Sequence, residues 1–409
     1  MQQQYRISPP EQVHTTVHLP ASKSISNRAL ILNALSLSNT PIHNLSDCED
    51  TRVIIESFNS NSNQFDVKGA GTAMRFLTAF LAGMEGEWVI RGSKRMHERP
   101  IHPLVETLNV LGAEIDYLEK EGYPPLRIRG RRLKGGEVYV AGNISSQFIS
   151  ALLMVAPMME KGLVMNIEKQ VISKPYIDLT IGMMKDYGVH TKWDENRITV
   201  KPQKYKAVEY TVEQDWSAAS YWYEIVALLP DAEVKLPGLR KVSLQGDANV
   251  ANLFSDLGVE TEYLEDGIII RHMKRKAKKF FHDFIREPDL AQTFASTCCF
   301  KGIPFLFSGT ESLKIKETDR IAALISELGK MGFVLRDRGS GMLEWDGERC
   351  FPAEVPAIDT YDDHRMGMSM APGSILLHPL LINDPMVVTK SYPSFWDDLK
   401  QAGFTIQPK

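Results

Sequence analysis

One signature recurs five times along this chain: an apolar run with helical spacing, a glycine, and then a short strand-like run. The glycines are Gly112, Gly188, Gly258, Gly332 and Gly403, and neighbouring ones lie 70 to 76 residues apart. A glycine that closes a helix before a strand is common. Five of them at a nearly constant spacing indicate duplicated folding units, and a chain of 409 residues has room for about six such units.

Each unit is expected to mix helices and strands. Alternating runs at residues 135–140 and 196–200 predict strands between the helices, so a plain βαβ series does not fit. A chain of this length exceeds a single hydrophobic core and predicts two or three domains. The best break in the second half precedes residues 215–221, where a further strand leads into a helix, and it leaves three units on either side.

Composition excludes several classes of protein. With 43% hydrophobic and 24% charged residues and a net charge of -4, the chain has a globular composition and no general affinity for polyanions. The one dense basic run, residues 271–279, is more typical of a solvated strand edge or turn than of a nucleic-acid site. Residues 1–4 begin no signal peptide, and no run of about 18 apolar residues could span a membrane. We therefore expect a cytoplasmic protein.

Neither the cysteines nor the histidines predict a metal site. Cys48, Cys298, Cys299 and Cys350 have no ligand spacing and indicate buried thiols in a reducing compartment. His364 has no second ligand at a zinc-protease spacing.

The stretch from residue 19 to residue 30 is the first candidate for an anion site. Pro20 ends the strand-like run over residues 13–19, and Ser22 or Ser24 can cap the helix that follows. Lys23 stands in the first helical turn, and Ser24 and Arg28 share a helix face. Two cations and a hydroxyl at a helix N-terminus suit a phosphorylated or carboxylated small molecule. A surface helix with solvated charges accounts for the same residues equally well.

Other segments of the first half carry the same kind of side chain. Residues 68–75 form a glycine-rich turn before an apolar helix, but the turn lacks the signatures of a dinucleotide fold and of a P-loop. A plain tight turn is the simpler interpretation there. Residues 95–100 add a second arginine site. Residues 143–148 add a polar helix start, where capping alone would explain one serine, and residues 173–176 are another polar turn that by itself says little.

The second half carries groups that could move protons. Asp289 precedes an apolar helix and could be only an N-cap. Residues 316–320 alternate in charge, which is also typical of a solvated helix face. Lys390 follows the strand-like residues 386–389. The cations at the ends of expected elements suit substrates with several anionic groups; they are Lys23, Arg28, Arg75, Arg99, Lys316, Arg320, Arg365 and Lys390.

Taken together, these segments resemble the 5-enolpyruvylshikimate-3-phosphate (EPSP) synthase family. The resemblance runs from about residue 19 to residue 390 in the family's order, through L-P-A-S-K-S-I-S-N-R, G-A-G-T-A-M-R, R-M-H-E-R-P, S-S-Q-F, S-K-P-Y, K-E-T-D-R and D-D-H-R-M. It implies an α+β fold of two lobes, each of three repeated βαβαββ units. The lower lobe would hold residues 1–20 and 213–409, and the upper lobe residues 21–212, with a site completed by lobe closure.

The resemblance implies transfer of the enolpyruvyl group of phosphoenolpyruvate to the 5-hydroxyl of shikimate 3-phosphate, with release of phosphate, in the route to chorismate. It implies a monomer with no cofactor, no metal and no nucleic-acid or membrane partner. The catalytic residues would be Lys23, Asp289, Glu317 and Lys316. Lys23 would contact both ligands, Asp289 would take the proton from the 5-hydroxyl, Glu317 would protonate the methylene carbon, and Lys316 would stabilise charge. Shikimate 3-phosphate would contact Lys23, Ser24, Arg28, Ser145, Ser146, Gln147, Ser173, Tyr176, Asp289, Ser312 and Lys316. Phosphoenolpyruvate would contact Lys23, Gly71, Arg99, Gln147, Arg320, Arg365 and Lys390.

The chain departs from the family pattern at three positions. Phe76 stands where a proline usually follows the loop arginine, which could change the fit to phosphoenolpyruvate and its analogue glyphosate, whereas Gly71 indicates a normal, glyphosate-sensitive pocket. Ser312 replaces an expected asparagine near the substrate phosphate. Pro372 predicts a break in the helix after Arg365, because proline inside a helix costs about 3 kcal/mol.

Three alternatives stay open. The sister enzyme that acts on UDP-N-acetylglucosamine shares the fold, but it typically has asparagine at the position of Ser24 and a reactive cysteine in a loop that here, over residues 91–99, has none. A catalytically silent anion-binding paralogue would not need Lys23, Asp289, Glu317 and Arg365. A nucleic-acid-binding relative would use the basic run.

Overall fold

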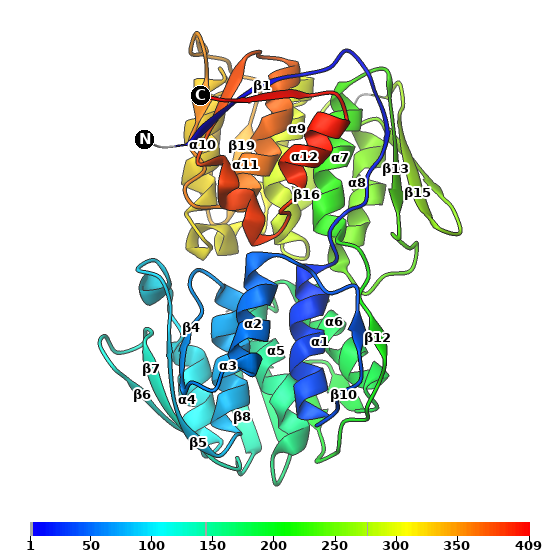
Figure 1. Ribbon diagram of the computed structural model, residues 1–409. Helices are drawn as coiled ribbons and strands as arrows, with labels where there is room; N and C mark the ends of the chain where they lie inside the picture. The colour runs from blue at the N-terminus through cyan, green and yellow to red at the C-terminus, as the bar shows by residue number, and fades with distance from the viewer. Residues whose placement is uncertain (1–2, 144, 276) are drawn as a thin grey trace. The chain divides into compact units, whose positions relative to one another are not determined.

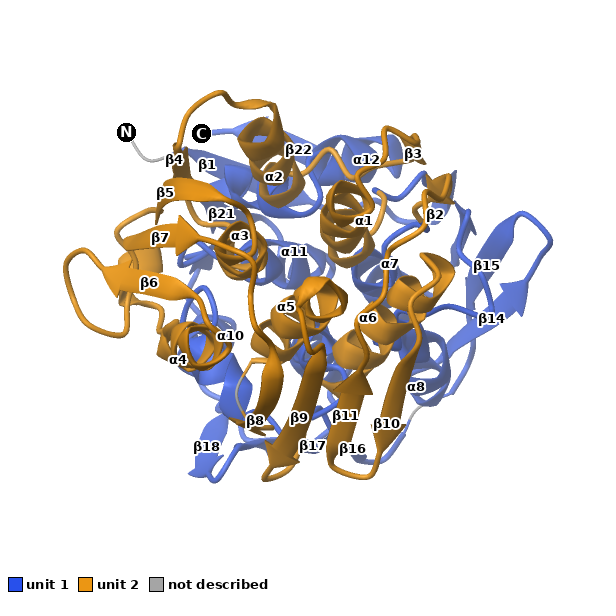
Figure 2. Cartoon of the chain, turned by 90° about the horizontal axis from the view of Figure 1, so that it is seen from below, with its two compact units in different colours: residues 1–20, 213–409 blue, residues 21–212 orange. Residues whose placement is uncertain are grey.

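The computed structural model describes residues 3–143, 145–275 and 277–409 (Figure 1). The chain divides into two compact units, coloured separately in Figure 2. Unit 1 comprises residues 1–20 and 213–409, and unit 2 comprises residues 21–212. Each unit encloses its own core of buried apolar side chains. Of the segments discussed above, Met1, Gln2, Ile144 and Lys276 lie outside the described residues.

A four-stranded sheet with two crossing helices is the repeated element. In its first complete copy the strand order is β4-β5-β7-β6, with β4 parallel to β5 and the other neighbours antiparallel. The chain runs through β4 (Gln64–Asp66), α3 (Gly71–Ala82), β5 (Gly86–Arg91), α4 (His102–Val110), β6 (Glu114–Tyr117) and β7 (Leu126–Gly130). This is a βαβαββ unit.

Four further sheets have the same strand order. In unit 2 the second copy comprises β8 (Gly136–Ala141), α5 (Ser146–Val155), β9 (Leu163–Glu168), α6 (Lys174–Asp186), β10 (Thr191–Asp194) and β11 (Arg197–Val200). Unit 1 begins with β2 (Val13–Thr16), α7 (Trp216–Leu228), β13 (Ala232–Pro237), α8 (Val250–Asp256), β14 (Val259–Tyr263) and β15 (Gly267–His272). It continues with β16 (Phe280–Asp283), α9 (Ala291–Lys301), β17 (Phe305–Ser308), α10 (Arg320–Lys330), β18 (Arg336–Gly339) and β19 (Met342–Trp345).

The last copy closes unit 1 with strands from both ends of the chain. Its sheet order is β20-β21-β1-β22, so β1 near the N-terminus lies between two C-terminal strands (Figure 1). The elements are β20 (Ala357–Ile358), α11 (His364–Met370), β21 (Leu380–Asn383), α12 (Phe395–Gln401), β22 (Thr405–Pro408) and β1 (Gln4–Ser8). A shorter assembly in unit 2 contains α1 (Lys23–Leu35), β3 (Ile42–His43), α2 (Glu49–Asn59) and β12 (Tyr210–Thr211), with β3 and β12 in parallel.

The glycines of the recurring signature have a common backbone conformation. Each follows a helix (α4, α6, α8, α10 or α12) after one residue and has φ between +82° and +103°. Only glycine adopts this left-handed region without steric cost from a Cβ atom, and it is the usual residue just past a helix end. The sequence repeat is therefore confirmed as a structural repeat.

Some local expectations are confirmed and others are wrong. α11 ends at Met370 and continues as a 3-10 turn over Ala371–Ile375, so the break predicted from Pro372 is present. Residues 386–389 are not a strand, because Asp384 with φ of +48° and Pro385 start the 3-10 turn η7 (Pro385–Lys390). Cys350 is exposed, whereas the other three cysteines are buried as predicted.

The described residues of the basic run, 271–275 and 277–279, lie at a strand end and in the loop after it. Arg271 on β15 pairs with Glu233 and Glu262 on the neighbouring strands. Helices long and apolar enough to cross a membrane are absent from the part of the chain that the structure describes.

Candidate active site

The N-terminus of α1 lies where the sequence predicts it. The helix begins at Lys23, and Ser22 occupies the N-cap position, but no side-chain hydrogen bond caps the helix there. Lys23 Nζ lies 3.3 Å from Asp50 Oδ2 on α2, and both side chains are largely buried. Ser24, in the first turn, is partly exposed. The first turn therefore keeps backbone N–H groups, a hydroxyl and an ammonium together, which suits an anion.

Arg28 is buried among neutral groups. Its side chain is 2% exposed, and Nε donates a 2.7 Å hydrogen bond to Thr180 Oγ1 on α6. Nη1 donates to the Ser24 carbonyl at 2.8 Å, and Nη2 donates to Ser150 Oγ at 3.3 Å and to the Tyr176 carbonyl at 3.2 Å. Burial lowers the pKa of Arg28 to about 10. A buried cation held only by neutral acceptors is poorly compensated.

The glycine-rich segment begins α3 and packs against two arginines. Gly71 is the first helical residue rather than part of a loop before the helix. A Cβ atom at Gly71 would lie 2.8 Å from Nη1 of both Arg75 and Arg99. Arg75 donates to the Gly71 carbonyl at 3.0 Å. Arg99 is 8% exposed, and its guanidinium forms neither a hydrogen bond nor an ion pair with any other described residue. Gly71 thus leaves room for two guanidinium groups at a helix start.

The starts of α5 and α6 complete this group in unit 2. Ser145 Oγ accepts a hydrogen bond from the Gln147 backbone at 3.3 Å, so Ser145 caps α5, and Ser146 is buried in its first turn. Gln147 Nε2 donates to Thr72 Oγ1 on α3 at 3.1 Å. Ser173, buried before α6, has φ of +53°. A non-glycine residue in this conformation stores strain, which occurs often at functional sites.

These contacts join the N-terminal parts of α1, α3, α5 and α6. Arg28 links α1 to α5 and α6, and Gln147 links α5 to α3. Figure 2 shows the four helices viewed end-on within unit 2, with strands of its sheets around them. Neither Arg28 nor Arg99 pairs with a carboxylate anywhere in the described ranges. Unit 2 therefore presents cations, hydroxyls and helix N-termini. Lys23 pairs with Asp50, whereas Arg28 and Arg99 have no neutralising acid among the described residues.

Unit 1 has the opposite arrangement around Asp289. Asp289 lies in the 3-10 turn η4 (Pro288–Leu290), and α9 begins after Leu290, so Asp289 is not the N-cap of α9. Its carboxylate accepts hydrogen bonds from Arg320 Nη1 at 3.1 Å and from Arg365 Nη2 at 2.8 Å. The Asp289 side chain is 19% exposed. It is held in place by two guanidinium groups and remains accessible.

Arg320 is the centre of this network. It is the first residue of α10, which Asp319 caps by accepting hydrogen bonds from two backbone N–H groups. Its guanidinium, 2% exposed, donates to Glu317 at 2.8 Å and to Asp363 at 2.7 Å in addition to Asp289. The prediction of a solvated helix face is therefore wrong for Arg320. The Glu317 side chain is 22% exposed, so it is only partly exposed.

The charges around Asp289 set its protonation. Burial would raise the pKa of the Asp289 carboxyl, but Arg365, Lys316 and Arg320 lower it below its usual range. Burial, together with the charge of Asp289, raises the pKa of nearby Asp247 to about 7. Asp289 is consequently a carboxylate at neutral pH, which a general base requires.

The remaining candidates of unit 1 differ in their contacts. Lys390, at the end of η7, contacts Asp362 Oδ1 at 2.6 Å and the Asp362 carbonyl at 2.7 Å. Ser312 is half-buried in the 3-10 turn η5 (Glu311–Ile315), and its side chain has no hydrogen bond to another described residue. A group of three acidic, histidine or cysteine side chains placed to hold a metal is absent from the described residues.

The sequence interpretation missed the residues that hold the candidates in place. Ser150 and Thr180 fix Arg28, but each stands inside an apolar run, where a single hydroxyl gives no signal. Asp363 has no distinguishing signal within the motif D-D-H-R-M, yet its side chain is 0% exposed and forms an ion pair with Arg320. The hydroxyl oxygen of Tyr221, on α7, accepts a hydrogen bond of 3.4 Å from Arg365 Nη1.

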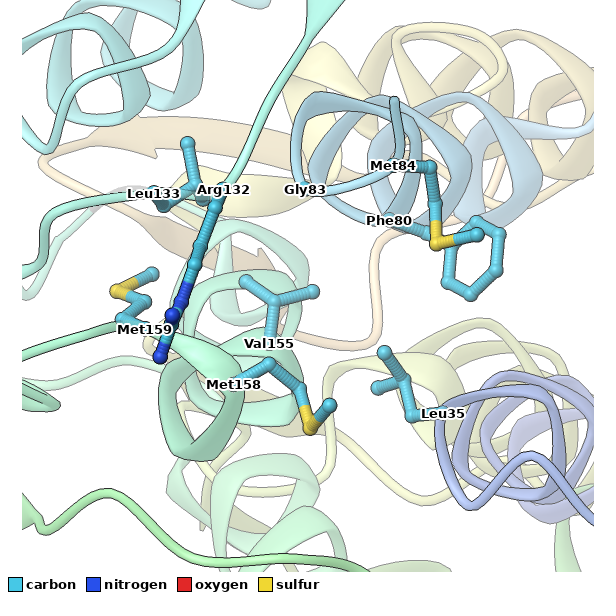
Figure 3. Close-up of a pocket in the computed structure, with 9 residues that line it drawn as sticks. All are labelled: Leu35, Phe80, Gly83, Met84, Arg132, Leu133, Val155, Met158 and Met159. Carbon is cyan, nitrogen blue, oxygen red and sulfur yellow. The ribbon is translucent and has the colours of Figure 1, made fainter. Parts of the chain in front are cut away.

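An apolar cavity of about 60 Å³ lies elsewhere in unit 2 (Figure 3). Leu35, Phe80 and Val155 line it, near the C-terminal ends of α1, α3 and α5, with methionines and Arg132. It contains none of the candidate site residues. On α1, α3 and α5 those residues lie toward the N-terminal ends instead.

Comparisons with known proteins agree on one family. The sequence matches the family model described as EPSP synthase (3-phosphoshikimate 1-carboxyvinyltransferase) over residues 7–60 and 53–399. It is 50% identical over 404 residues to the 3-phosphoshikimate 1-carboxyvinyltransferase of Bacteroides fragilis (strain ATCC 25285), covering 98% of each chain. It is 37% identical to that of Aliivibrio salmonicida, covering 97% of this chain and 98% of the relative. The structure resembles that of EPSP synthase from Acinetobacter baumannii with a TM-score of 0.79 at 20% identity, over the whole of both chains, a likeness of fold.

Proposed function

Because the chain belongs to the EPSP synthase family, we propose that the residues described above bind shikimate 3-phosphate and phosphoenolpyruvate and carry out the transfer between them. The protein is a transferase, a 3-phosphoshikimate 1-carboxyvinyltransferase of aromatic amino acid biosynthesis. It transfers the enolpyruvyl group of phosphoenolpyruvate to shikimate 3-phosphate. The roles of single residues are our proposal.

Unit 2 supplies the cations that bind both substrates in this proposal. Shikimate 3-phosphate contacts Lys23 and the polar starts of α1, α5 and α6, through Ser24, Arg28, Ser145, Ser146, Gln147, Ser173 and Tyr176. Phosphoenolpyruvate contacts Lys23, Gly71, Arg99 and Gln147. The proposal is supported by Arg28 and Arg99, which are buried without a carboxylate partner in the described parts of the chain. An anionic ligand would compensate both charges.

Unit 1 supplies the acid and the base. Asp289 removes the proton from the 5-hydroxyl, which then attacks C2 of phosphoenolpyruvate, while Glu317 protonates the methylene carbon. The tetrahedral intermediate then loses phosphate from C2 and a proton from the new methyl group, which the Glu317 carboxylate takes back, and the enol ether of the product forms. Arg320, Arg365 and Lys390 bind phosphoenolpyruvate, and Lys316 stabilises the charge that develops. Ser312 remains a proposed contact of shikimate 3-phosphate.

One observation carries the assignment of the base: Asp289 accepts hydrogen bonds from both Arg320 and Arg365 while 19% of its side chain stays exposed. The two guanidinium groups keep the carboxylate ionised and fix its direction. A base that is both ionised and oriented contributes about 10²- to 10⁴-fold to a rate.

The proposed enzyme is a cytoplasmic monomer that works without cofactor or metal. The monomer and the lack of a cofactor and of a metal rest on the family resemblance. The cytoplasmic location rests on the cysteines, all four of which are free thiols.

The test is phosphate release on mixing the protein with shikimate 3-phosphate and phosphoenolpyruvate. We expect Asp289→Asn to lower kcat by about 10²- to 10⁴-fold, with the Kd of shikimate 3-phosphate, measured by calorimetry, changed far less. Asp266→Asn is the matched control, because Asp266 forms an exposed ion pair with Lys235 in the same unit.

Each alternative gives a different outcome. Turnover with UDP-N-acetylglucosamine as the acceptor, and none with shikimate 3-phosphate, would identify the sister activity. Binding of both substrates without phosphate release would identify a silent paralogue. Full activity of Asp289→Asn would remove Asp289 as the base.

A further inference from the structure

The Arg28 side chain packs against an aromatic ring, whereas Arg320 and Arg365 contact carboxylates. Its Cζ atom lies 5.2 Å from the centre of the Phe76 ring, within the range of a cation–π contact. Phe76, on α3, is 1% exposed. The ring therefore covers one side of a guanidinium whose hydrogen bonds all go to neutral oxygens.

An aromatic ring and a carboxylate act differently on a buried guanidinium. A carboxylate neutralises the charge, as Asp363 and Glu317 do for Arg320. The face of a phenyl ring attracts a cation through its quadrupole and carries no net charge. Arg28 thus keeps its full positive charge for a ligand while the ring restricts its movement. A second arginine–phenylalanine contact lies in the same unit, where Arg75 Cζ is 5.6 Å from the centre of the Phe148 ring.

We propose that Phe76 is a positioning residue for shikimate 3-phosphate: its ring fixes the Arg28 guanidinium and leaves its charge available for an anionic group of that substrate. The inference rests on the proposed role of Arg28 in substrate binding. It gives a function to a side chain that stands where the family usually has proline, a residue with no aromatic face.

The inference separates the two substrates. Loss of the ring loosens Arg28, so the Kd of shikimate 3-phosphate rises while the KM for phosphoenolpyruvate stays within about twofold. For Phe76→Leu we expect a rise of about 2- to 30-fold in that Kd, the range to which one cation–π contact corresponds. A purely structural role of Phe76 would lower stability and alter both substrates together.

The decisive experiment varies the ring and leaves its volume nearly unchanged. Phenylalanine analogues with one, two and three ring fluorines at position 76 weaken the negative face step by step. We expect the Kd of shikimate 3-phosphate, measured by calorimetry, to rise with each fluorine. Phe80→Leu is the matched control, since Phe80 lies one turn later on α3 and packs edge-on against Phe58 at 5.2 Å. The Kd of shikimate 3-phosphate for the Phe80→Leu variant should equal that of the unmodified protein.

Two failures can be told apart by including Arg28→Met. If Arg28→Met leaves the Kd of shikimate 3-phosphate unchanged, the binding role of Arg28 is wrong and the inference falls with it. If Arg28→Met weakens binding but the fluorinated series shows no trend, only the role of Phe76 is overturned. The fluorinated proteins keep this test valid even if Phe76→Leu does not fold.

Discussion

Buried arginines are treated in opposite ways by the two units. In unit 2, Arg28 and Arg99 have no carboxylate partner among the described residues. In unit 1, Arg320 binds three carboxylates and Arg365 binds Asp289. The comparison teaches that a buried cation can serve two different purposes in this protein. In the function we propose, Arg320 and Arg365 of unit 1 orient the carboxylates that transfer protons. Arg28 and Arg99 of unit 2 instead receive their counter-charge from a substrate.

The contrast has an energetic consequence. Removing one member of a buried ion pair leaves an uncompensated charge and strongly destabilises a protein. Removing a buried cation that lacks a partner relieves a desolvation penalty instead. Substitution of the ion-paired arginines of unit 1 should therefore lower stability most. Substitution of Arg28 or Arg99 in unit 2 should instead weaken ligand binding most.

Arg320→Met should have the largest effect on folding. Asp363, which is 0% exposed, and Asp289 would lose the guanidinium between them, and we expect a loss of about 3–5 kcal/mol in the free energy of unfolding. Urea titration without substrates measures it. If Arg320→Met lowered the free energy of unfolding by less than Arg99→Met does, the proposed difference between the units would be wrong.

Arg99→Met should leave the free energy of unfolding within about 1 kcal/mol of the unmodified value, or raise it. The KM for phosphoenolpyruvate should rise about 10- to 100-fold, as expected for lost hydrogen bonds to a charged group. Steady-state kinetics paired with urea titration gives both values. An unchanged KM would mean that Arg99 does not contact this substrate.

Gly71→Ala sharpens the comparison within unit 2. The new Cβ atom would lie 2.8 Å from Nη1 of Arg75 and of Arg99, so the flexible arginine ends must move. We expect the KM for phosphoenolpyruvate to rise by about tenfold, less than for Arg99→Met. In the control Gly329→Ala, on α10, the added atom meets no atom within 4 Å beyond the adjacent residues and the backbone of its own helix, and the kinetics of this variant should match the unmodified enzyme.

The smallest effect is expected in the pH dependence of stability. Because the pKa of Asp289 is lowered in the folded state, its contribution is present above the unfolded pKa of about 3.9 and is lost as pH falls through the folded value. Asp247, whose pKa is raised to about 7 by burial and by the charge of Asp289, is first replaced by Asn in both proteins. In that background, the difference in unfolding free energy between the protein with Asp289 and Asp289→Asn should be constant from pH 7 to about pH 5. It should then shrink toward pH 3. A difference that stays constant would contradict the lowered pKa.

Local patterns predicted much of this molecule because they act over a few residues. The helix closures at the five repeat glycines and the start of α1 at Lys23 depend on backbone preferences that the sequence carries directly. η7 was mistaken for a strand, since its residues are β-branched and apolar while Asp384 and Pro385 decide its conformation.

The supports of the site could not be found in this way. Thr180 reaches Arg28 across 152 residues of sequence, and Asp363 reaches Arg320 across 43. Spacing rules cover only neighbours on one helix or strand. A contact made by tertiary packing leaves no such pattern, so the charged residues could be named while the groups that hold them could not.

The position of β1 determines the order in which the units can be completed during synthesis on the ribosome. β1 pairs with β21 and β22, and β22 ends at Pro408, so the sheet that closes unit 1 cannot form until residue 408 has been made. Unit 2 is complete at residue 212. At about 5–20 residues per second, it has tens of seconds to fold alone while the N-terminal strand waits for its partners. Translation itself therefore separates the assembly of the two units.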